Sequence, residues 1–197
     1  MTNLEPSIRV VRSMKARVTR DVALSQITFA FFIAVCVALH PGVVIRTNEG
    51  GMSNYGVHLK TVVPYTLALV LASALSYRAT RFLQRARIET RHFDFLLRIY
   101  SALILLTLLT TYGYTLSTAQ KDLHVVVGVV VAVFELVASL WMYRTIRSLH
   151  LVFAITLIGF VLAALTFFGA LHVLFLTQVL VGGAFAILLV RTSRLLG

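Results

Sequence analysis

Histidines are the side chains of this sequence whose type and spacing could do chemistry. Four of them, His58, His92, His124 and His150, each lie at the start of one of four consecutive apolar runs. If these runs cross a membrane in alternation, His58 and His124 share one membrane level, and His92 and His150 share the other. Imidazole binds iron, and one pair of histidines at each level is what two bis-histidine haems require. The other two histidines are His40 and His172.

The elements that position these histidines must be membrane-spanning segments. Hydrophobic residues make up 59% of the 197 residues, charged residues make up 13%, and the mean hydropathy is +0.91. Soluble domains carry about 25% charged residues, so the composition excludes a soluble enzyme, a disordered tail and a disulfide scaffold. The net charge of +11 would suggest nucleic acid in a soluble chain. In a membrane protein it is explained by orientation, and we expect no nucleic-acid partner.

The fold class predicted is an all-α integral membrane bundle of six transmembrane helices. A helix needs about 20 mostly apolar residues to cross the hydrocarbon core, and these runs lack the alternation typical of a β-barrel. Glycine is the only helix breaker between the last two runs, so we expect a tight turn at residues 168–170. The six runs are residues 22–45, 58–77, 93–114, 123–143, 150–168 and 171–190.

Basic residues predict the orientation of the six spans. Lys and Arg side chains concentrate in cytoplasmic loops, and here 14 lie on one side of the spans and 3 on the other, with Arg98 inside a span. We therefore expect both termini in the cytoplasm, and the plasma membrane, or the inner membrane of a bacterium, as the location. The domain organisation predicted is a basic segment 1–21, a transmembrane domain 22–190 and a short basic tail 191–197. Segment 1–21 is either an amphipathic helix on anionic inner-leaflet lipid or a disordered basic arm.

Ionisable residues inside the spans suggest an intramembrane ion pair. Glu135 and Arg98 lie at similar predicted depths, and Asp94 competes for Arg98 from the preceding turn of the same helix. The network formed by Arg98, Glu135 and Asp94 is interpreted as a lock between two spans, and a proton or ion relay is the alternative.

The histidine layout resembles the ascorbate-reducible, di-haem transmembrane cytochrome b family. A glycine four residues after a histidine, His124 to Gly128, and the sequence Ser76-Tyr77-Arg78 are similar to features of that family. The resemblance implies two b-type haems, one ligated by His58 and His124 and the other by His92 and His150, and electron transfer across the membrane. The alternative is that these histidines only occupy the membrane interfaces.

A second resemblance involves the first outer loop. The sequence Gly51-Met52-Ser53-Asn54-Tyr55-Gly56 precedes the second span, and Asp122-Leu123-His124 opens the fourth. This is similar to the DRAM/Frag/Sfk-type six-helix membrane proteins. The resemblance implies an outer polar vestibule, a link to lipid or membrane stress, and no established catalysis. The vestibule residues expected are Glu49, Ser53, Asn54 and Asp122.

The function favoured is that of a multi-pass membrane protein of non-enzymatic or unknown activity, which senses or binds lipid, or another membrane component, through this outer vestibule. Electron transfer through haem b is the first alternative. The second is an outer-facing metal or lipid-processing site, because imidazole and carboxylate groups are zinc ligands. The outward residues are His40, His58, His124, His172, Glu49 and Asp122.

Overall fold

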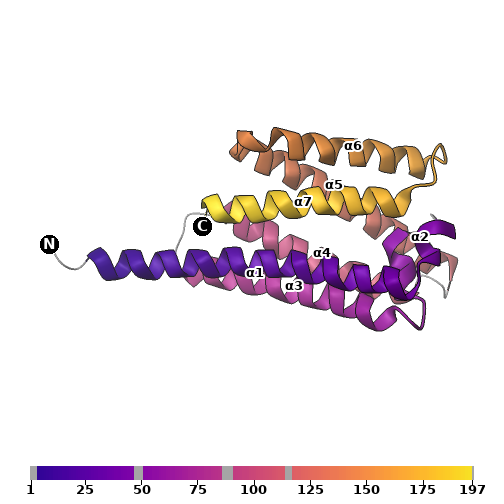
Figure 1. Cartoon of the computed structure of the whole chain (residues 1–197), viewed down its shortest axis with the longest axis horizontal. Helices are drawn as coiled ribbons and strands as arrows, with labels where there is room; N and C mark the ends of the chain where they lie inside the picture. Colours follow the sequence, from indigo (N-terminus) through magenta and orange to yellow (C-terminus); the bar gives the residue numbers. More distant parts are fainter. Residues whose placement is uncertain (1–3, 47–50, 86–90, 114–116, 197) are drawn as a thin grey trace.

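A computed structural model describes residues 4–46, 51–85, 91–113 and 117–196, and all regular structure within these ranges is helical. Six of the helices are long and apolar enough to cross a membrane (Figure 1), as the sequence predicts. The long helices are α1 (Leu4–Leu39), α3 (Val62–Arg85), α4 (Arg91–Gly113), α5 (Thr118–Thr145), α6 (His150–Phe167) and α7 (Leu174–Leu196). Three short elements are α2 (Gly42–Arg46) and the 3₁₀ helices η1 (Gly51–Gly56) and η2 (Arg147–Leu149).

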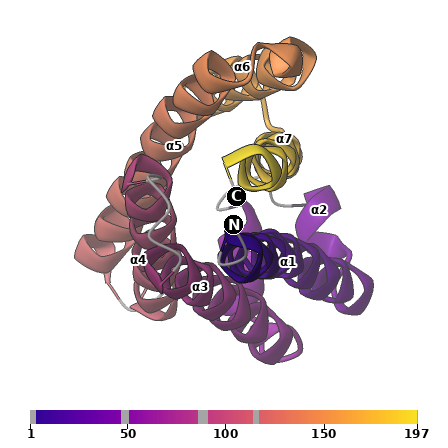
Figure 2. The same ribbon diagram turned by 90° about the vertical axis from the view of Figure 1, so that its left-hand side faces the viewer.

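The helices pack in chain order, with one exception. Figure 2 shows α1 beside α3, α3 beside α4, and α5 and α6 curving around α7. The last helix, α7, contacts α1, α5 and α6, so it closes the bundle. Both termini lie at one end of the molecule in Figure 1, while α2 and the α6–α7 turn lie at the other. The end that carries the termini is here called the basic end, and the opposite end is called the η1 end.

The first helix differs from the prediction at both of its ends. It runs from Leu4 to Leu39 without interruption, so residues 4–21 continue directly into the first apolar helix, of which Ser13–Leu39 is long and apolar enough to cross a membrane. Its length of 36 residues corresponds to about 54 Å, which exceeds the hydrocarbon core. The helix ends at Leu39 instead of continuing to residue 45, because Pro41 disfavours helical backbone at His40. Chain direction then changes before α2 begins at Gly42.

The second span is displaced along the sequence relative to the prediction. His58 lies in a turn that precedes the helix, and its carbonyl accepts hydrogen bonds from the backbone amides of Thr61 and Val62. The helix continues to Arg85, two turns beyond the predicted end at residue 77. Long arginine side chains can extend toward water while their helix stays within the apolar layer. The arginines after residue 77 therefore do not mark the end of this helix, and the predicted end is too early. The other four spans lie close to their predicted ranges.

The turn predicted at residues 168–170 is confirmed. Gly169 adopts a positive φ of 78°, a left-handed conformation that glycine adopts without steric cost. The amides of Ala170 and Leu171 both donate to the carbonyl of Leu165, which satisfies the end of α6. This turn separates α6 from α7 and lets the two helices pack side by side.

Hydrogen bonds between hydroxyl and amide side chains join α1, α3 and α4 midway along the bundle. Ser25 on α1 contacts Ser76 on α3 at 2.9 Å, and Ser73 on α3 contacts Ser101 on α4 at 2.8 Å. Side chains of this kind are common contacts between membrane helices, where each contributes about 0.6 kcal/mol. These contacts fix the alignment of α1, α3 and α4 along their axes. That alignment determines which residues meet at each end of the bundle.

Candidate functional site

The short helix η1 is inserted into one end of the bundle. Its Met52 amide donates to Oε1 of Gln178 on α7 at 2.7 Å. Its Tyr55 ring packs edge-on against Phe175, also on α7, with ring centroids 6.0 Å apart. On the other side, the hydroxyl of Thr61, the residue before α3, donates to the Tyr55 carbonyl at 2.7 Å. These contacts seat η1 between α3 and α7, although the segment is only six residues long.

His124 is the centre of the polar contacts beneath η1. It lies on α5 with only 7% of its surface exposed. Its Nε2 lies 2.8 Å from Oγ of Ser53 in η1, and its Nδ1 lies 2.9 Å from Oγ1 of Thr110 on α4. One imidazole on α5 therefore joins α5 to both η1 and α4. Ser53 and Thr110 are themselves buried.

Two tautomers of His124 satisfy these hydrogen bonds. The Thr110 hydroxyl carries one proton and lies within hydrogen-bonding distance of three acceptors, the carbonyls of Leu106 and Thr107 on α4 and Nδ1 of His124. When this proton goes to the α4 backbone, Thr110 Oγ1 accepts from Nδ1, and the Ser53 hydroxyl donates to Nε2. When it goes to Nδ1, Nε2 donates to Ser53 Oγ instead.

A tyrosine hydroxyl lies next to this chain of contacts. The Tyr65 hydroxyl on α3 lies 3.4 Å from Thr111 Oγ1 and close to Ser53. Thr111 Oγ1 also lies 2.8 Å from the Thr107 carbonyl, to which it can donate, and either hydroxyl can be the donor of the Tyr65–Thr111 contact. Gly56 makes this approach possible, because a Cβ atom at that position would collide with the Tyr65 ring and the Thr111 methyl group.

Tyr55 adds a second buried phenol to the η1 end. It is fully buried, and its hydroxyl has no hydrogen-bond partner among the described residues. Burial, and then the nearby Cys36 thiol, raise the pKa of Tyr55 from 10.0 to about 12. Tyr55 therefore stays neutral at physiological pH. Its protonated form stabilises the fold fully below pH 10, and this contribution is lost as the pH rises through 12.

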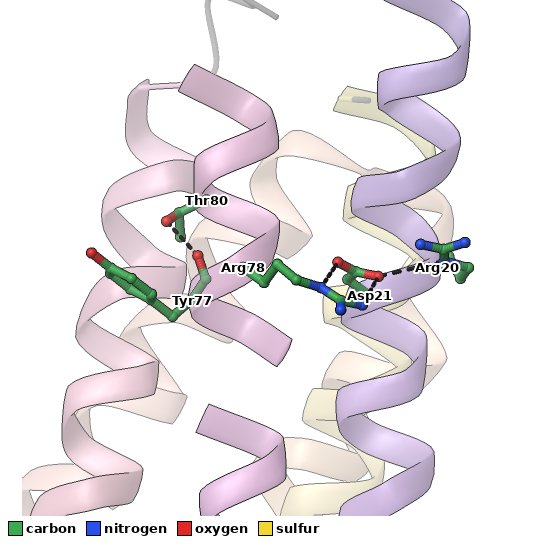
Figure 3. Close-up of polar contacts among 5 residues, drawn as sticks. All are labelled: Arg20, Asp21, Tyr77, Arg78 and Thr80. Atoms are coloured by element: carbon green, nitrogen blue, oxygen red, sulfur yellow. Dashed lines mark hydrogen bonds and ion pairs between the residues drawn. The ribbon is translucent and has the colours of Figure 1, made fainter. Parts of the chain in front are cut away.

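At the basic end, a buried carboxylate joins α1 to α3. Figure 3 shows Asp21 of α1 between two arginines. Arg78 of α3 binds this carboxylate through two guanidinium nitrogens, with Nε 2.7 Å from Oδ2 and Nη2 2.8 Å from Oδ1. Arg20 lies 3.5 Å from Oδ1. The Asp21 side chain is fully buried, whereas half of the Arg78 side chain is exposed, so the pair bridges the protein interior and its surface.

The predicted pairing of Arg98 with Glu135 is wrong. Arg98 pairs with Asp94 on its own helix at 3.0 Å, which is the competing contact that the sequence suggested. Positions two residues apart on a helix face directions about 200° apart. Tyr100 faces Phe134, the neighbour of Glu135, with ring centroids 6.5 Å apart, so Arg98 faces away from α5. Glu135 makes no ion pair within the described part of the chain.

The arrangement of the histidines does not fit two bis-histidine haems. The His58 ring lies against His40, with centroids 4.5 Å apart, rather than against His124. Both nitrogens of His124 are bonded to hydroxyl groups, and an axial ligand needs one nitrogen for the iron. His92 lies near Trp141, with centroids 6.4 Å apart, and His92 and His150 are both exposed.

The remaining predicted residues of the η1 end are only partly brought together. Ser53 is buried against His124, Asn54 is half-buried, and Asp122 and His172 are exposed. Glu49 lies outside the described residues. Within the ranges that the structure describes, no three histidine, cysteine, aspartate or glutamate side chains form a group able to hold a metal ion.

Three of the polar residues that shape these two ends were not predicted. Thr110 resembles any other threonine of an apolar span, and no spacing rule marks it as a partner of His124. The sequence places Asp21 in a basic cytoplasmic segment, and it marks Arg78 only as one of the basic residues that predict the orientation. A carboxylate at the start of one span and an arginine at the end of the next would have been the signal for their pairing.

Comparisons with protein-family models, with curated proteins and with solved structures find no match for this chain.

Proposed function

We propose that this chain is a lipid-binding integral membrane protein whose basic end holds anionic headgroups at the cytoplasmic leaflet. The η1 end then faces a membrane component at the opposite interface. The observation that carries the proposal is the set of exposed arginines that several helices contribute to the basic end. These arginines are Arg17, Arg20, Arg78, Arg81, Arg85, Arg144, Arg191 and Arg194.

Few described acidic side chains offset this positive charge. Asp21 is fully buried against Arg78, and Asp94 is 19% exposed and paired with Arg98. The guanidinium groups therefore dominate the electrostatic potential where the helices leave the hydrocarbon core. Each basic residue near a membrane surface contributes about 1 kcal/mol to the attraction of anionic lipid, and the arginine fork binds phosphate through two parallel hydrogen bonds.

The proposed orientation has a direct test with single cysteines in a Cys36→Ala background. The basic end carries the arginine excess that is typical of cytoplasmic loops. Lys60→Cys is exposed at the η1 end and should react with a membrane-impermeant maleimide on intact cells. Arg85→Cys should react only after permeabilisation. Reaction of Arg85→Cys alone in intact cells would show the opposite orientation.

Removal of two arginines should weaken binding of anionic lipid. Arg85 and Arg144 are exposed at the ends of α3 and α5. At about 1 kcal/mol for each charge, the double variant Arg85→Gln/Arg144→Gln should raise the apparent Kd for phosphatidylglycerol about 30-fold. Titration of detergent-solubilised protein with this lipid, followed by native mass spectrometry, measures the effect. Higher salt should reduce the difference, because exposed charges are screened.

The matched control removes two exposed lysines at the other end, in Lys60→Gln/Lys121→Gln. This variant has the same loss of net charge and should bind phosphatidylglycerol like the wild type. Equal weakening in both double variants would indicate a response to net charge alone. Unchanged binding in the arginine variant would leave the arginines with only a role in topology and contradict the proposal.

A further inference from the structure

We infer that Ser53 is a nucleophile activated by His124, and that the η1 end is a site for acyl transfer from an ester of a membrane lipid. This inference goes beyond lipid binding at the basic end and does not depend on it. The residues that carry it are Ser53, His124 and Thr110, with Tyr65 as the neighbouring donor.

The hydrogen-bond distances are those that a serine nucleophile needs. Ser53 Oγ lies 2.8 Å from His124 Nε2, within the range expected of a nucleophile and its base. The reactive tautomer carries the imidazole proton on Nδ1, which donates to Thr110 Oγ1 at 2.9 Å, while the Thr110 hydroxyl donates to the α4 backbone. Thr110 takes the position of the third group that orients the base. A serine that only stabilised the fold would be satisfied equally well by a backbone carbonyl, as Ser25 is by Ala72.

The site lies at the membrane depth of lipid ester groups. His124 follows the first residue of α5, Thr118, by six positions, which places it about 9 Å below the start of the helix. Thr110 lies about one turn before the end of α4 at Gly113. The polar interfacial layer extends about 5–8 Å beyond the hydrocarbon core on each side. The ester carbonyls of phospholipids lie at this boundary.

A donor for the developing oxyanion lies beside the nucleophile. The Tyr65 hydroxyl lies close to Ser53 and makes a long contact of 3.4 Å with Thr111. In the reaction this hydroxyl turns its proton from Thr111 to the oxyanion that forms beside Ser53. Donors aimed at the oxygen of a tetrahedral intermediate supply a large share of catalysis in acyl transfer. Gly56 is required here, since a side chain at that position would displace the Tyr65 ring.

The reaction proceeds in two balanced steps. Ser53 Oγ attacks the ester carbonyl carbon and its proton passes to His124 Nε2, while the carbonyl oxygen becomes an oxyanion that Tyr65 stabilises. The carbon–oxygen bond to the leaving alcohol breaks, and the alcohol oxygen takes the proton from Nε2. Water then attacks the acyl-serine and gives one proton to Nε2. Its oxygen stays on the released carboxylic acid, and Ser53 recovers the proton from Nε2.

A fluorophosphonate probe tests the nucleophile directly, because attack by an activated serine expels fluoride and leaves a stable phosphonyl adduct. The purified full chain in nanodiscs should acquire one adduct, located on Ser53 by peptide mass spectrometry. His124→Gln keeps a side chain able to hydrogen-bond and removes the base, so labelling should slow about 100-fold or more. Tyr65→Phe and Thr110→Val should each reduce the rate while leaving Ser53 in place. Hydrolysis of 4-nitrophenyl butyrate should fall in the same order.

The control is Ser25→Ala, which removes a buried serine bonded to a carbonyl and should label like the wild type. Circular dichroism and size-exclusion chromatography check that each variant is folded. If His124→Gln fails to fold, Thr110→Val and Tyr65→Phe carry the comparison. A folded wild-type protein that takes no label on Ser53 would overturn the proposal. Equal labelling of the wild type and the His124, Thr110 and Tyr65 variants would overturn it too. Neither result would affect lipid binding at the basic end, which is measured with different variants.

Discussion

Arg78→Gln should lower the free energy of unfolding by about 3 kcal/mol, because it leaves the Asp21 carboxylate buried without its partner. Asp21 is fully buried, and Arg78 supplies two hydrogen bonds of 2.7 and 2.8 Å to it. The remaining contact with Arg20, at 3.5 Å, is too long to replace them. Asp21→Asn should cost less, because Arg78 is half exposed and its guanidinium can turn toward headgroups and water.

A double-mutant cycle measures the coupling between these two residues. Reversible unfolding in mixed micelles, followed for the two single variants and for Asp21→Asn/Arg78→Gln, should show the double variant recovering part of the loss. The control is Arg98→Gln. It breaks a pair within one helix, whose arginine is 44% exposed, and should cost less than Arg78→Gln. Additive losses in the Asp21–Arg78 cycle would contradict the interpretation that this pair joins α1 to α3.

Gly159→Leu should destabilise the protein by about 3 kcal/mol, at the upper end of the range for overpacking a buried contact. Gly159 is buried on α6, and a Cβ atom at this position would lie 2.6 Å from Cγ2 of Val181 and 3.5 Å from its backbone nitrogen. α6 packs mainly on α7, so separating the two helices at this point removes most of what holds α6 in place.

Gly128→Leu is the matched control for the glycine prediction. Gly128 lies within α5, and a Cβ atom there would have nothing within 4 Å. Both variants gain about 1 kcal/mol of helix propensity, so the difference between them isolates the packing at α6 and α7. The same micelle unfolding measurement applies to both. Equal stabilities for the two variants would show that the close approach at Gly159 does not support the fold.

Much of the fold could be predicted from local properties of the sequence. Four of the six spans, including α4 (Arg91–Gly113), lie close to their apolar runs, because the hydrocarbon core selects for length and hydropathy. The turn at Gly169 was predictable because the last two runs together are too long for one crossing. The predicted helix boundaries failed where arginines are frequent, at the first residues of α1 and the last residues of α3. Polarity along the chain does not reveal how far a backbone stays helical.

The candidate site was predictable only in part. His124 and Ser53 were each singled out, from the layout of the histidines and from the first outer loop. Their contact was not expected, and His124 was instead paired with His58. That pairing depended on which faces of the spans point toward one another, and a span that is apolar on all sides carries no such information. Thr110 was missed for the same reason.

The sequence by itself determined that this chain has six segments long and apolar enough to cross a membrane. It also determined where the basic residues lie relative to them. Both follow from composition along the chain and need no knowledge of which helices touch. Only the tertiary structure decided which polar groups meet: Asp21 with Arg78, Arg98 with Asp94, and His124 with Ser53 and Thr110. These contacts depend on the rotation of each helix about its own axis and on the seating of η1. In an almost uniformly apolar span, packing against neighbouring helices sets that rotation, since the surrounding lipid does not distinguish one face from another.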